Sequence, residues 1–255
     1  MQLIDSHCHF DDERFDPDRD EAYQRALSAG IDALVVAGIK ADWWPRVRQV
    51  CRDYPGLYPA YGMHPMFMAD HQQNDIHSLE SWLTREPAVA VGECGLDFYI
   101  ENPDRKRQQE LFEAQLTLAQ KHRLPVIIHA RRSVEEVLNT LRRFSGLRGM
   151  LHSFSGSEQQ ARRLIDMGFL LSFGGPLTYP RARRLRQTAG NLPLAGLMLE
   201  SDAPDQPDVE YRGRRNEPAR VKQVLETLAE LRGDTREEVA SVTTANAREL
   251  FGIRR

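Results

Sequence analysis

Eight short apolar segments, each followed by amphipathic, charged sequence, constrain how this chain can fold. They begin about 28 residues apart on average, the length of one strand-plus-helix unit. Several are apolar throughout, as strands covered on both faces are. Strict alternation of strands and helices predicts a parallel sheet, and eight units in 255 residues favour an α/β fold closed as a (β/α)8 TIM barrel. The segments lie at 3–4, 33–38, 57–62, 88–92, 125–129, 149–152, 169–173 and 197–199.

No internal repeat, low-complexity tract or linker interrupts this series, so we expect a single barrel domain over residues 1–255. A chain of this length buries roughly 70–75% of the surface that its unfolded form exposes, and its core therefore needs no disulfide bonds. The three cysteines are few and odd in number, which predicts a protein of a reducing compartment rather than a disulfide framework.

Charge and the N-terminal sequence exclude several classes of protein. The 37 acidic and 34 basic residues give a net charge of −3, which argues against a protein that coats nucleic acid or membranes through bulk positive charge. The first residues, MQLIDSHCHFDD, lack the basic and apolar regions of a signal peptide, and no apolar run reaches the roughly 20 residues of a membrane span. We expect a cytoplasmic protein with no membrane partner. A monomer is the expected state, because no apolar stripe is left without a place in the barrel.

Two helices are expected to begin with a capping box, a Ser or Thr followed three positions later by an acid or amide. These are Ser133 with Glu136 and Ser155 with Glu158. The long polar stretch 202–216 has no helical pattern, which indicates a functional loop rather than a domain boundary.

Histidines and two acidic residues gather at the ends of the predicted strands. In a parallel barrel the carboxyl ends of all strands surround one mouth, and that mouth holds the active site. Side chains that end different strands therefore converge, even when they are far apart in the sequence. The residues expected to converge are His7, His9, Glu93, His129, His152 and Asp202, and His64 directly follows another strand.

Four imidazoles and two carboxylates crowded into one volume indicate a metal centre. Without a cation the carboxylates repel each other and the ring nitrogens lack partners. A lone histidine at a strand end is usually a hydrogen-bonded structural residue. Six histidines and acids that all end strands are not explained by coincidence. Six ligands exceed the three protein ligands of a typical catalytic zinc. Two divalent ions about 3.5–4 Å apart, bridged by one carboxylate, fit the number better.

The spacing at the N-terminus supports this prediction. His7 and His9 are two positions apart on a strand, so both side chains point to one face. Asp5 shares that face one pleat lower, where it either orients a histidine or caps a loop. Cys8 points the other way and is expected in the core.

Seven segments make the chain resemble the TatD family of metal-dependent deoxyribonucleases, a branch of the amidohydrolase-like metallo-barrels. The similarity runs in order from about residue 3 to residue 251, with no large insertion. The segments are DSHCHF (5–10), YGMHP (61–65), VGECGLDF (91–98), PVIIHAR (125–131), LHSFSG (151–156), LESDAP (199–204) and RRNEP (214–218).

The resemblance implies a (β/α)8 barrel that hydrolyses phosphodiester bonds in DNA, as an exonuclease acting on single strands or 3′ ends. It implies two divalent ions, for which zinc, magnesium or manganese are the candidates. Glu93 would bridge them. His7, His9 and Asp202 would complete the first site, and His129 and His152 the second. A glutamate at this position argues against the carbamylated lysine of other amidohydrolase branches. The loop after Asp202 is more acidic than expected beside a phosphate backbone.

A mechanism follows as a hypothesis. Asp202 is the candidate general base for a metal-activated water, and Glu93 is the second catalytic carboxylate. His64 either contacts the phosphate, protonates the leaving oxygen or stabilises its own turn. Asn216 either caps the following helix or fixes the neighbouring arginines. The candidate phosphate-binding residues are Arg131, Arg212, Arg214 and Arg215, because a guanidinium matches a phosphate.

Two other functions use the same residues. One is hydrolysis of a small phosphoester, lactone or amide on the same dinuclear site. An apolar pocket at the mouth, in place of arginines directed at the metals, would favour it. The other is a metal-bound barrel that acts only as an interaction module, whose mark would be a missing ligand or a blocked mouth.

Overall fold

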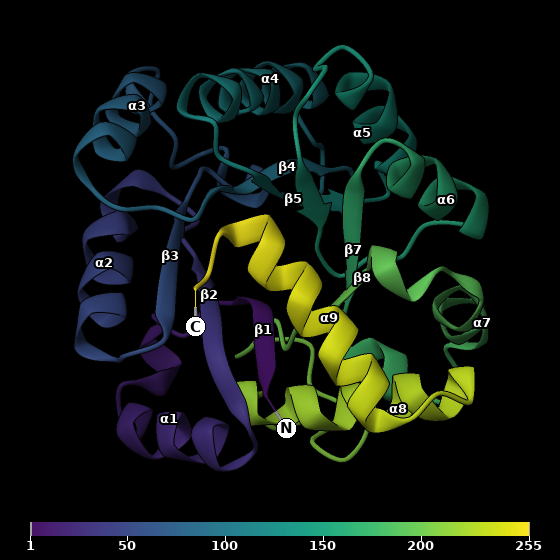
Figure 1. The fold of residues 1–255 in the computed structure, drawn as a ribbon. Coiled ribbons are helices and arrows are strands. Elements are labelled where there is room, and N and C mark those ends of the chain that lie inside the picture. Colours follow the sequence, from purple (N-terminus) through teal and green to yellow (C-terminus); the bar gives the residue numbers. More distant parts are fainter. Residues whose placement is uncertain (1, 255) are drawn as a thin grey trace.

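Eight parallel strands follow one another around the molecule in sequence order, and helices cover their outer side (Figure 1). The structure is a computed structural model, and it describes residues 2–254. It confirms the expected TIM barrel. The strands are β1 (Leu3–Cys8), β2 (Ile31–Ala37), β3 (Leu57–Tyr61), β4 (Ala90–Asp97), β5 (Val126–Arg131), β6 (Gly149–Leu151), β7 (Phe169–Phe173) and β8 (Leu197–Leu199). The helices are α1 (Arg19–Ser28), α2 (Trp44–Asp53), α3 (Asp75–Arg85), α4 (Arg105–His122), α5 (Val134–Leu141), α6 (Glu158–Asp166), α7 (Arg183–Asn191), α8 (Val221–Arg232) and α9 (Arg236–Phe251).

The first and last strands meet at a seam that is closed at its upper end. Just beyond β8, the backbone N–H of Asp202 donates to the carbonyl of His7 over 3.0 Å, and that of His9 donates to the carbonyl of Ala203 over 2.7 Å. The Ser6 hydroxyl adds a bond of 2.8 Å to the carbonyl of Leu199. Three of the expected metal ligands thus lie at the point where the barrel closes.

Helix α9 covers the opposite end of the barrel, where the strands begin. Figure 1 shows it, in yellow, lying across this end. Its apolar residues Ala247, Leu250 and Phe251 join one core cluster with inward-facing strand residues such as Val35 and Ile127. Since this end is filled by packed side chains, the mouth at the carboxyl ends of the strands is where a ligand enters.

Several strands run further than their apolar residues predict. β1 continues to Cys8, β4 to Asp97 and β5 to Arg131. His7 and Glu93 therefore lie inside strands rather than after them, and their side chains point into the barrel from its upper layer. Pairing of β1 with β2 and of β4 with β5 continues beyond these polar residues, which hydropathy alone does not reveal.

Both predicted capping boxes are wrong in detail. Ser133 does precede α5, but its hydroxyl donates to the carbonyl of Leu96 over 2.6 Å instead of capping the helix. Helix α6 begins later than expected, and its capping box is formed by Ser157 and Gln160. Within residues 2–254, no helix combines the length and apolar character needed to cross a membrane.

Candidate metal centre

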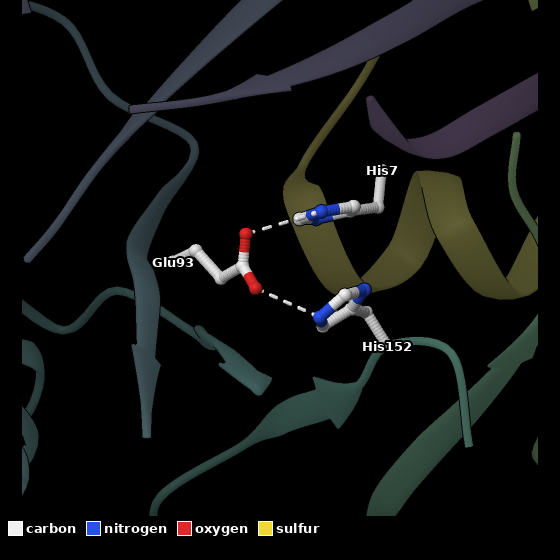
Figure 2. A group of neighbouring side chains, drawn as sticks. All are labelled: His7, Glu93 and His152. Atoms are coloured by element: carbon white, nitrogen blue, oxygen red, sulfur yellow. Dashed lines mark ion pairs between the residues drawn. The ribbon is translucent and has the colours of Figure 1, made fainter. Parts of the chain in front are cut away.

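Glu93 lies at the middle of the converging side chains, and each of its carboxylate oxygens faces a different set of imidazoles. Figure 2 shows it between His7 and His152, with one oxygen directed at each ring. The carboxylate is buried, with 1% of its side chain exposed. The structure therefore brings the expected groups together around one central carboxylate.

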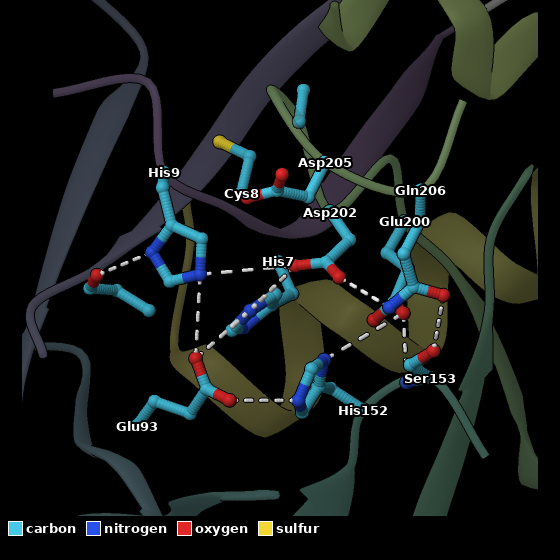
Figure 3. Close-up of polar contacts among 12 residues, drawn as sticks. His7, Cys8, His9, Glu93, His152, Ser153, Glu200, Asp202, Asp205 and Gln206 are labelled. Atoms are coloured by element: carbon cyan, nitrogen blue, oxygen red, sulfur yellow. Dashed lines mark hydrogen bonds and ion pairs between the residues drawn. The ribbon is translucent and has the colours of Figure 1, made fainter. Parts of the chain in front are cut away.

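The first set comes from β1 and the segment after β8. Glu93 Oε2 lies 3.3 Å from both His7 Nε2 and His9 Nε2. Asp202 Oδ1 lies 3.3 Å from the same nitrogen of His7 and 3.7 Å from that of His9. Figure 3 shows these four side chains facing one another.

The second set comes from β5, β6 and the end of β3. Glu93 Oε1 lies 3.1 Å from His129 Nδ1 and 2.8 Å from His152 Nε2. His64 Nε2 also lies 2.8 Å from this oxygen. His64, for which the sequence left open contact with the phosphate, protonation of the leaving oxygen or a role in its own turn, thus reaches the centre.

Contacts behind the rings decide which ring nitrogen faces the centre. His9 Nδ1 donates to the carbonyl of Ala37 over 2.9 Å, which leaves Nε2 free to bind. His129 Nε2 donates to Asp97 Oδ2 over 2.9 Å, which leaves Nδ1 free. A carboxylate or carbonyl behind the ring is the usual arrangement for a metal-binding histidine.

His64 has the opposite arrangement. Its Nδ1 accepts the backbone N–H of Met66 over 3.0 Å, so the neutral ring carries its hydrogen on Nε2 and points it inward. The ring is thus a hydrogen-bond donor toward the centre, while His9 and His129 offer lone pairs.

Comparison with known proteins places the chain. The family model described as "TatD related DNase" matches residues 4–252. The chain belongs to the TatD family. A relative from Escherichia coli K12, named "Uncharacterized metal-dependent hydrolase YjjV", is 40% identical over 99% of this chain and 98% of its own length. The similarly named YabD of Bacillus subtilis is 36% identical over 98% of this chain and 99% of its own.

Solved structures agree with this assignment. The crystal structure of YjjV, described as a TatD homologue, superposes with a TM-score of 0.95 at 39% identity, covering 99% of this chain and 98% of that one. A TatD family hydrolase from Entamoeba histolytica shares the fold with a TM-score of 0.85 at 19% identity, covering 98% of each chain. The chain is therefore a full-length match to a family of metal-dependent hydrolases.

Burial and the facing imidazoles set the pKa values of the acidic groups in this TatD-family centre. Burial alone would raise the pKa of Glu93, but the facing imidazoles of His64, His152 and His7 hold it well below its ordinary value. Burial likewise opposes ionisation of Asp202, and the contact with His7 is the main cause that lowers its pKa to about 2. Burial lowers the pKa of His64 to about 4. The site thus combines ionised carboxylates with a neutral His64 ring.

The residues present fit divalent cations. His7 Nε2 and Glu93 Oε2 are fully buried and form no hydrogen bond within residues 2–254. Buried polar atoms without partners are costly unless a ligand satisfies them. Closely spaced nitrogen and oxygen donors also form ligand clusters, one of them His7, His9 and Asp202 and another His7, Glu93 and His152. The TatD-family centre is therefore built to bind metal.

Asp5 and Asn216 support the centre through the backbone. Asp5 Oδ1 accepts the backbone N–H groups of His7 and Ser201, over 3.3 and 2.9 Å, so it joins β1 to the segment after β8 instead of orienting an imidazole. Asn216 Nδ2 donates to the carbonyls of Ser201 and Asp205, over 2.7 and 2.9 Å. It therefore holds the loop that carries Asp202, and it fixes no arginine.

Of the four candidate phosphate-binding arginines, one lies at the cavity and three do not. Arg131 lines the cavity above the centre. Arg212 and Arg214 are exposed and do not line it. Arg215 is paired with Asp18 and stacks on the ring of Phe15. The loop 202–216 thus leaves these three arginines outside the lining of the cavity, a path that sequence spacing does not reveal.

The structure adds residues that the sequence argument missed. Asp97 lies four positions after Glu93 in β4 and faces the same side, so the alternation of strand side chains could have found it. Gln206 donates to Asp202 Oδ2, and Glu200 accepts the backbone N–H of Ser153 over 2.7 Å beside His152 (Figure 3). Those two contacts depend on loop conformation and left no sequence signal.

A cavity of about 690 Å³ opens above the centre. Its sides differ in chemistry. Apolar residues from the β6 and β7 ends form one wall, and others from the β2 and β3 ends form a second. Acidic residues line the β1 and β8 side, where Arg14 pairs with Asp12 and Asp205. The apolar wall residues are Phe154, Phe173, Pro176 and Leu185 on one side and Ile39, Trp43, Met66 and Phe67 on the other.

Proposed function

We propose that this TatD-family protein hydrolyses phosphodiester bonds in DNA, and that it removes nucleotides from a strand end. The observation that carries the proposal is the position of Glu93, whose two oxygens each face a separate set of imidazoles. A carboxylate in that position suits a bridge between two divalent ions, the arrangement used for in-line displacement at phosphorus.

Six side chains would hold the ions. His7, His9 and Asp202 would bind one, His129 and His152 the other, and Glu93 both. Mixed nitrogen and oxygen donors are compatible with zinc, manganese or magnesium. When bound, two divalent ions lower the pKa of water toward about 7 and neutralise charge on the phosphoryl oxygens.

Asp202 would accept the proton of the attacking water. Its Oδ1 faces the ring nitrogens of His7 and His9, while its Oδ2 is held by Gln206. The carboxylate is ionised, because its pKa is lowered to about 2, mainly by the contact with His7 that opposes burial. An ionised carboxylate held in a fixed position can accept a proton from a water within hydrogen-bond reach.

His64 and Arg131 would bind the substrate. The Nε2–H of His64 points into the centre, where it can donate to a phosphoryl or leaving oxygen. Arg131 lies in β5 two positions after His129, and its guanidinium can donate two parallel hydrogen bonds to a phosphate.

The uneven charge of the mouth supports action at strand ends. Asp12 and Asp205 line the cavity on the side of β1 and β8, where the single Arg14 between them neutralises their two charges only in part, and Arg131 lines it on the side of β4 and β5. In an eight-stranded barrel these two sides lie opposite each other (Figure 1). A polynucleotide that continued across the acidic side would bring phosphates against carboxylates. A strand that ends at the metals avoids this repulsion.

The test is a product analysis on oligonucleotides labelled at one end, single- and double-stranded, with zinc, manganese or magnesium. We expect stepwise shortening from one end, loss of turnover after chelation and recovery when a divalent ion is added. Internal cuts at random positions would contradict end specificity. Hydrolysis by rigorously metal-free protein would contradict the dinuclear mechanism.

The apolar walls favour a second candidate function, hydrolysis of a small phosphoester, lactone or amide. Phe154 and Phe173 beside the centre suit an apolar group as well as a nucleobase. A panel of nitrophenyl phosphates, lactones and single-stranded DNA separates the two functions by comparing kcat/KM.

A further inference from the structure

Beyond the metals, an exposed group of arginines and aromatic rings lies where the β4 and β5 ends meet the outside. We define it as the β4–β5 rim, made of Phe98, Tyr99, Arg105, Arg131 and Arg132. The guanidinium carbons of Arg131 and Arg132 lie 3.8 and 4.4 Å from the centre of the Tyr99 ring. That of Arg105 lies 4.3 Å from the centre of the neighbouring Phe98 ring. Three guanidinium groups are thus held on two consecutive rings.

The backbone of this rim is arranged so that two successive arginines reach one ring. In an extended strand, neighbouring side chains point to opposite faces. β5 ends at Arg131, and Arg132 has a φ of 55°, in the left-handed region that non-glycine residues seldom adopt. This break in the strand lets both side chains reach Tyr99.

The three arginines have no acidic partner of their own. Within residues 2–254 no carboxylate lies within 4.0 Å of their guanidinium nitrogens, in contrast to Arg14, which is paired with Asp12 and Asp205. Tyr99 itself is half exposed, with 50% of the residue accessible to solvent. Charges that are ordered on rings but not neutralised are ready to bind an anion.

We propose that the β4–β5 rim binds the phosphate backbone of a single strand whose end lies at the metals, and that Tyr99 is a positioning residue that holds two of the guanidinium groups. This rests on the proposed nuclease function and adds to it the side on which the strand leaves the site. β4 and β5 pair through Gly95 with His129 and through Asp97 with Arg131, so the rim continues directly from the metal-facing residues. The acidic β1 and β8 side gives the strand no equivalent exit.

Binding of a fluorescent deoxythymidine strand of about 12 nucleotides, a length within the range that single-strand binding proteins cover, tests the proposal. The Asp202→Asn protein with added divalent metal is used because its hydrolysis is expected to be too slow to shorten the strand during the measurement, and anisotropy is recorded between about 50 and 200 mM salt. Each phosphate contact contributes about 0.7 to the slope of log affinity against log salt for single strands. We expect Arg132→Ala and Arg105→Ala each to lower that slope by about 0.7 and the affinity by about tenfold.

Tyr99 is tested by a pair of variants. Tyr99→Ala should weaken binding, because both guanidinium groups lose the ring that orders them. Tyr99→Phe should bind like the unmodified background, because the ring face and not the hydroxyl makes the contacts. Equal loss in both variants would overturn the positioning role.

The matched control is Arg142→Ala, at the C-terminal end of α5 and therefore near the opposite end of the barrel. It should leave the slope unchanged. If the parent protein degrades DNA but the Arg132 and Arg105 variants have the same salt slope as the Asp202→Asn background, the rim proposal fails while the proposed nuclease function stands. If the parent protein neither binds nor degrades DNA with any metal, the proposed nuclease function fails first.

Discussion

At the scale of single residues, Glu93 is the group on which both halves of the centre depend. We expect Glu93→Ala to abolish hydrolysis, and Asp202→Asn to lower kcat by about 10²–10⁴-fold, the usual contribution of a general base. Both variants should keep the far-ultraviolet circular dichroism of the parent, because neither residue belongs to the apolar core. An active Glu93→Ala protein would refute the bridging assignment.

Asp97 has a second, more indirect effect, since it holds the ring of His129. Burial would raise the pKa of this carboxyl, but the hydrogen bond from His129 keeps it below its ordinary value. We expect Asp97→Asn to weaken binding of the ion at His129 by about 10–100-fold. Competition with a chromogenic chelator measures this. Asp166→Asn, an exposed aspartate at the end of α6, is the control, and equal affinities in the two variants would contradict the assignment.

The residues that the sequence could identify are those fixed by strand geometry. His7, His9, Glu93, His129, His152 and Asp202 meet because their strands are neighbours in one barrel, and strand order follows from the alternation of elements. The arginines of the last loop could not be placed in this way. Their direction depends on contacts such as the pairing of Arg215 with Asp18, which no spacing rule contains.

At the scale of elements, that same ion pair ties the start of α1 to the loop before α8. The hydrogen bond from Arg215 is the main cause that lowers the pKa of Asp18 from 3.8 to about 2. A carboxylate with a depressed pKa stabilises the fold above its unfolded pKa, and this contribution is lost as the pH falls through the folded value. The stabilisation is therefore complete above pH 4 and disappears toward pH 2.

We expect Arg215→Ala to be less stable than the parent near pH 6, with a difference that shrinks between pH 4 and pH 2. Urea unfolding at a series of pH values measures this. Arg85→Ala is the matched control, because that guanidinium bonds to the carbonyl of Ser81 in its own helix. A difference that is constant with pH would show that Arg215 acts through packing on Phe15 instead.

Helix α9 is the element that fills the lower end of the barrel. Its Phe251 is buried against inward-facing strand residues. We expect Phe251→Ala to lower the free energy of unfolding by about 3–5 kcal/mol, because a large cavity remains in the core. Thermal unfolding measures the loss, with the exposed Glu249→Ala on the same helix as control. Metal affinity at low temperature should not change, since the centre lies at the other end of the strands.

At the scale of the whole molecule, one end of the barrel contributes to stability and the other end carries the reactive groups. The lower end is apolar and filled, while the upper end concentrates imidazoles, carboxylates and an open cavity. The fold class was predictable because apolar runs and amphipathic stretches alternate throughout. The exact strand ends were not, because pairing carries β1 and β4 through polar residues that hydropathy assigns to loops.

The seam between β1 and β8 has a consequence for how the protein is made. Synthesis delivers His7 and His9 among the earliest residues, whereas Asp202 emerges only after seven further strands have been produced. A nascent chain that has been made only as far as β8 therefore carries the other five expected ligands without Asp202, the carboxylate that completes the set. Metal binding by the complete set of donors has to wait until translation has passed the final strand.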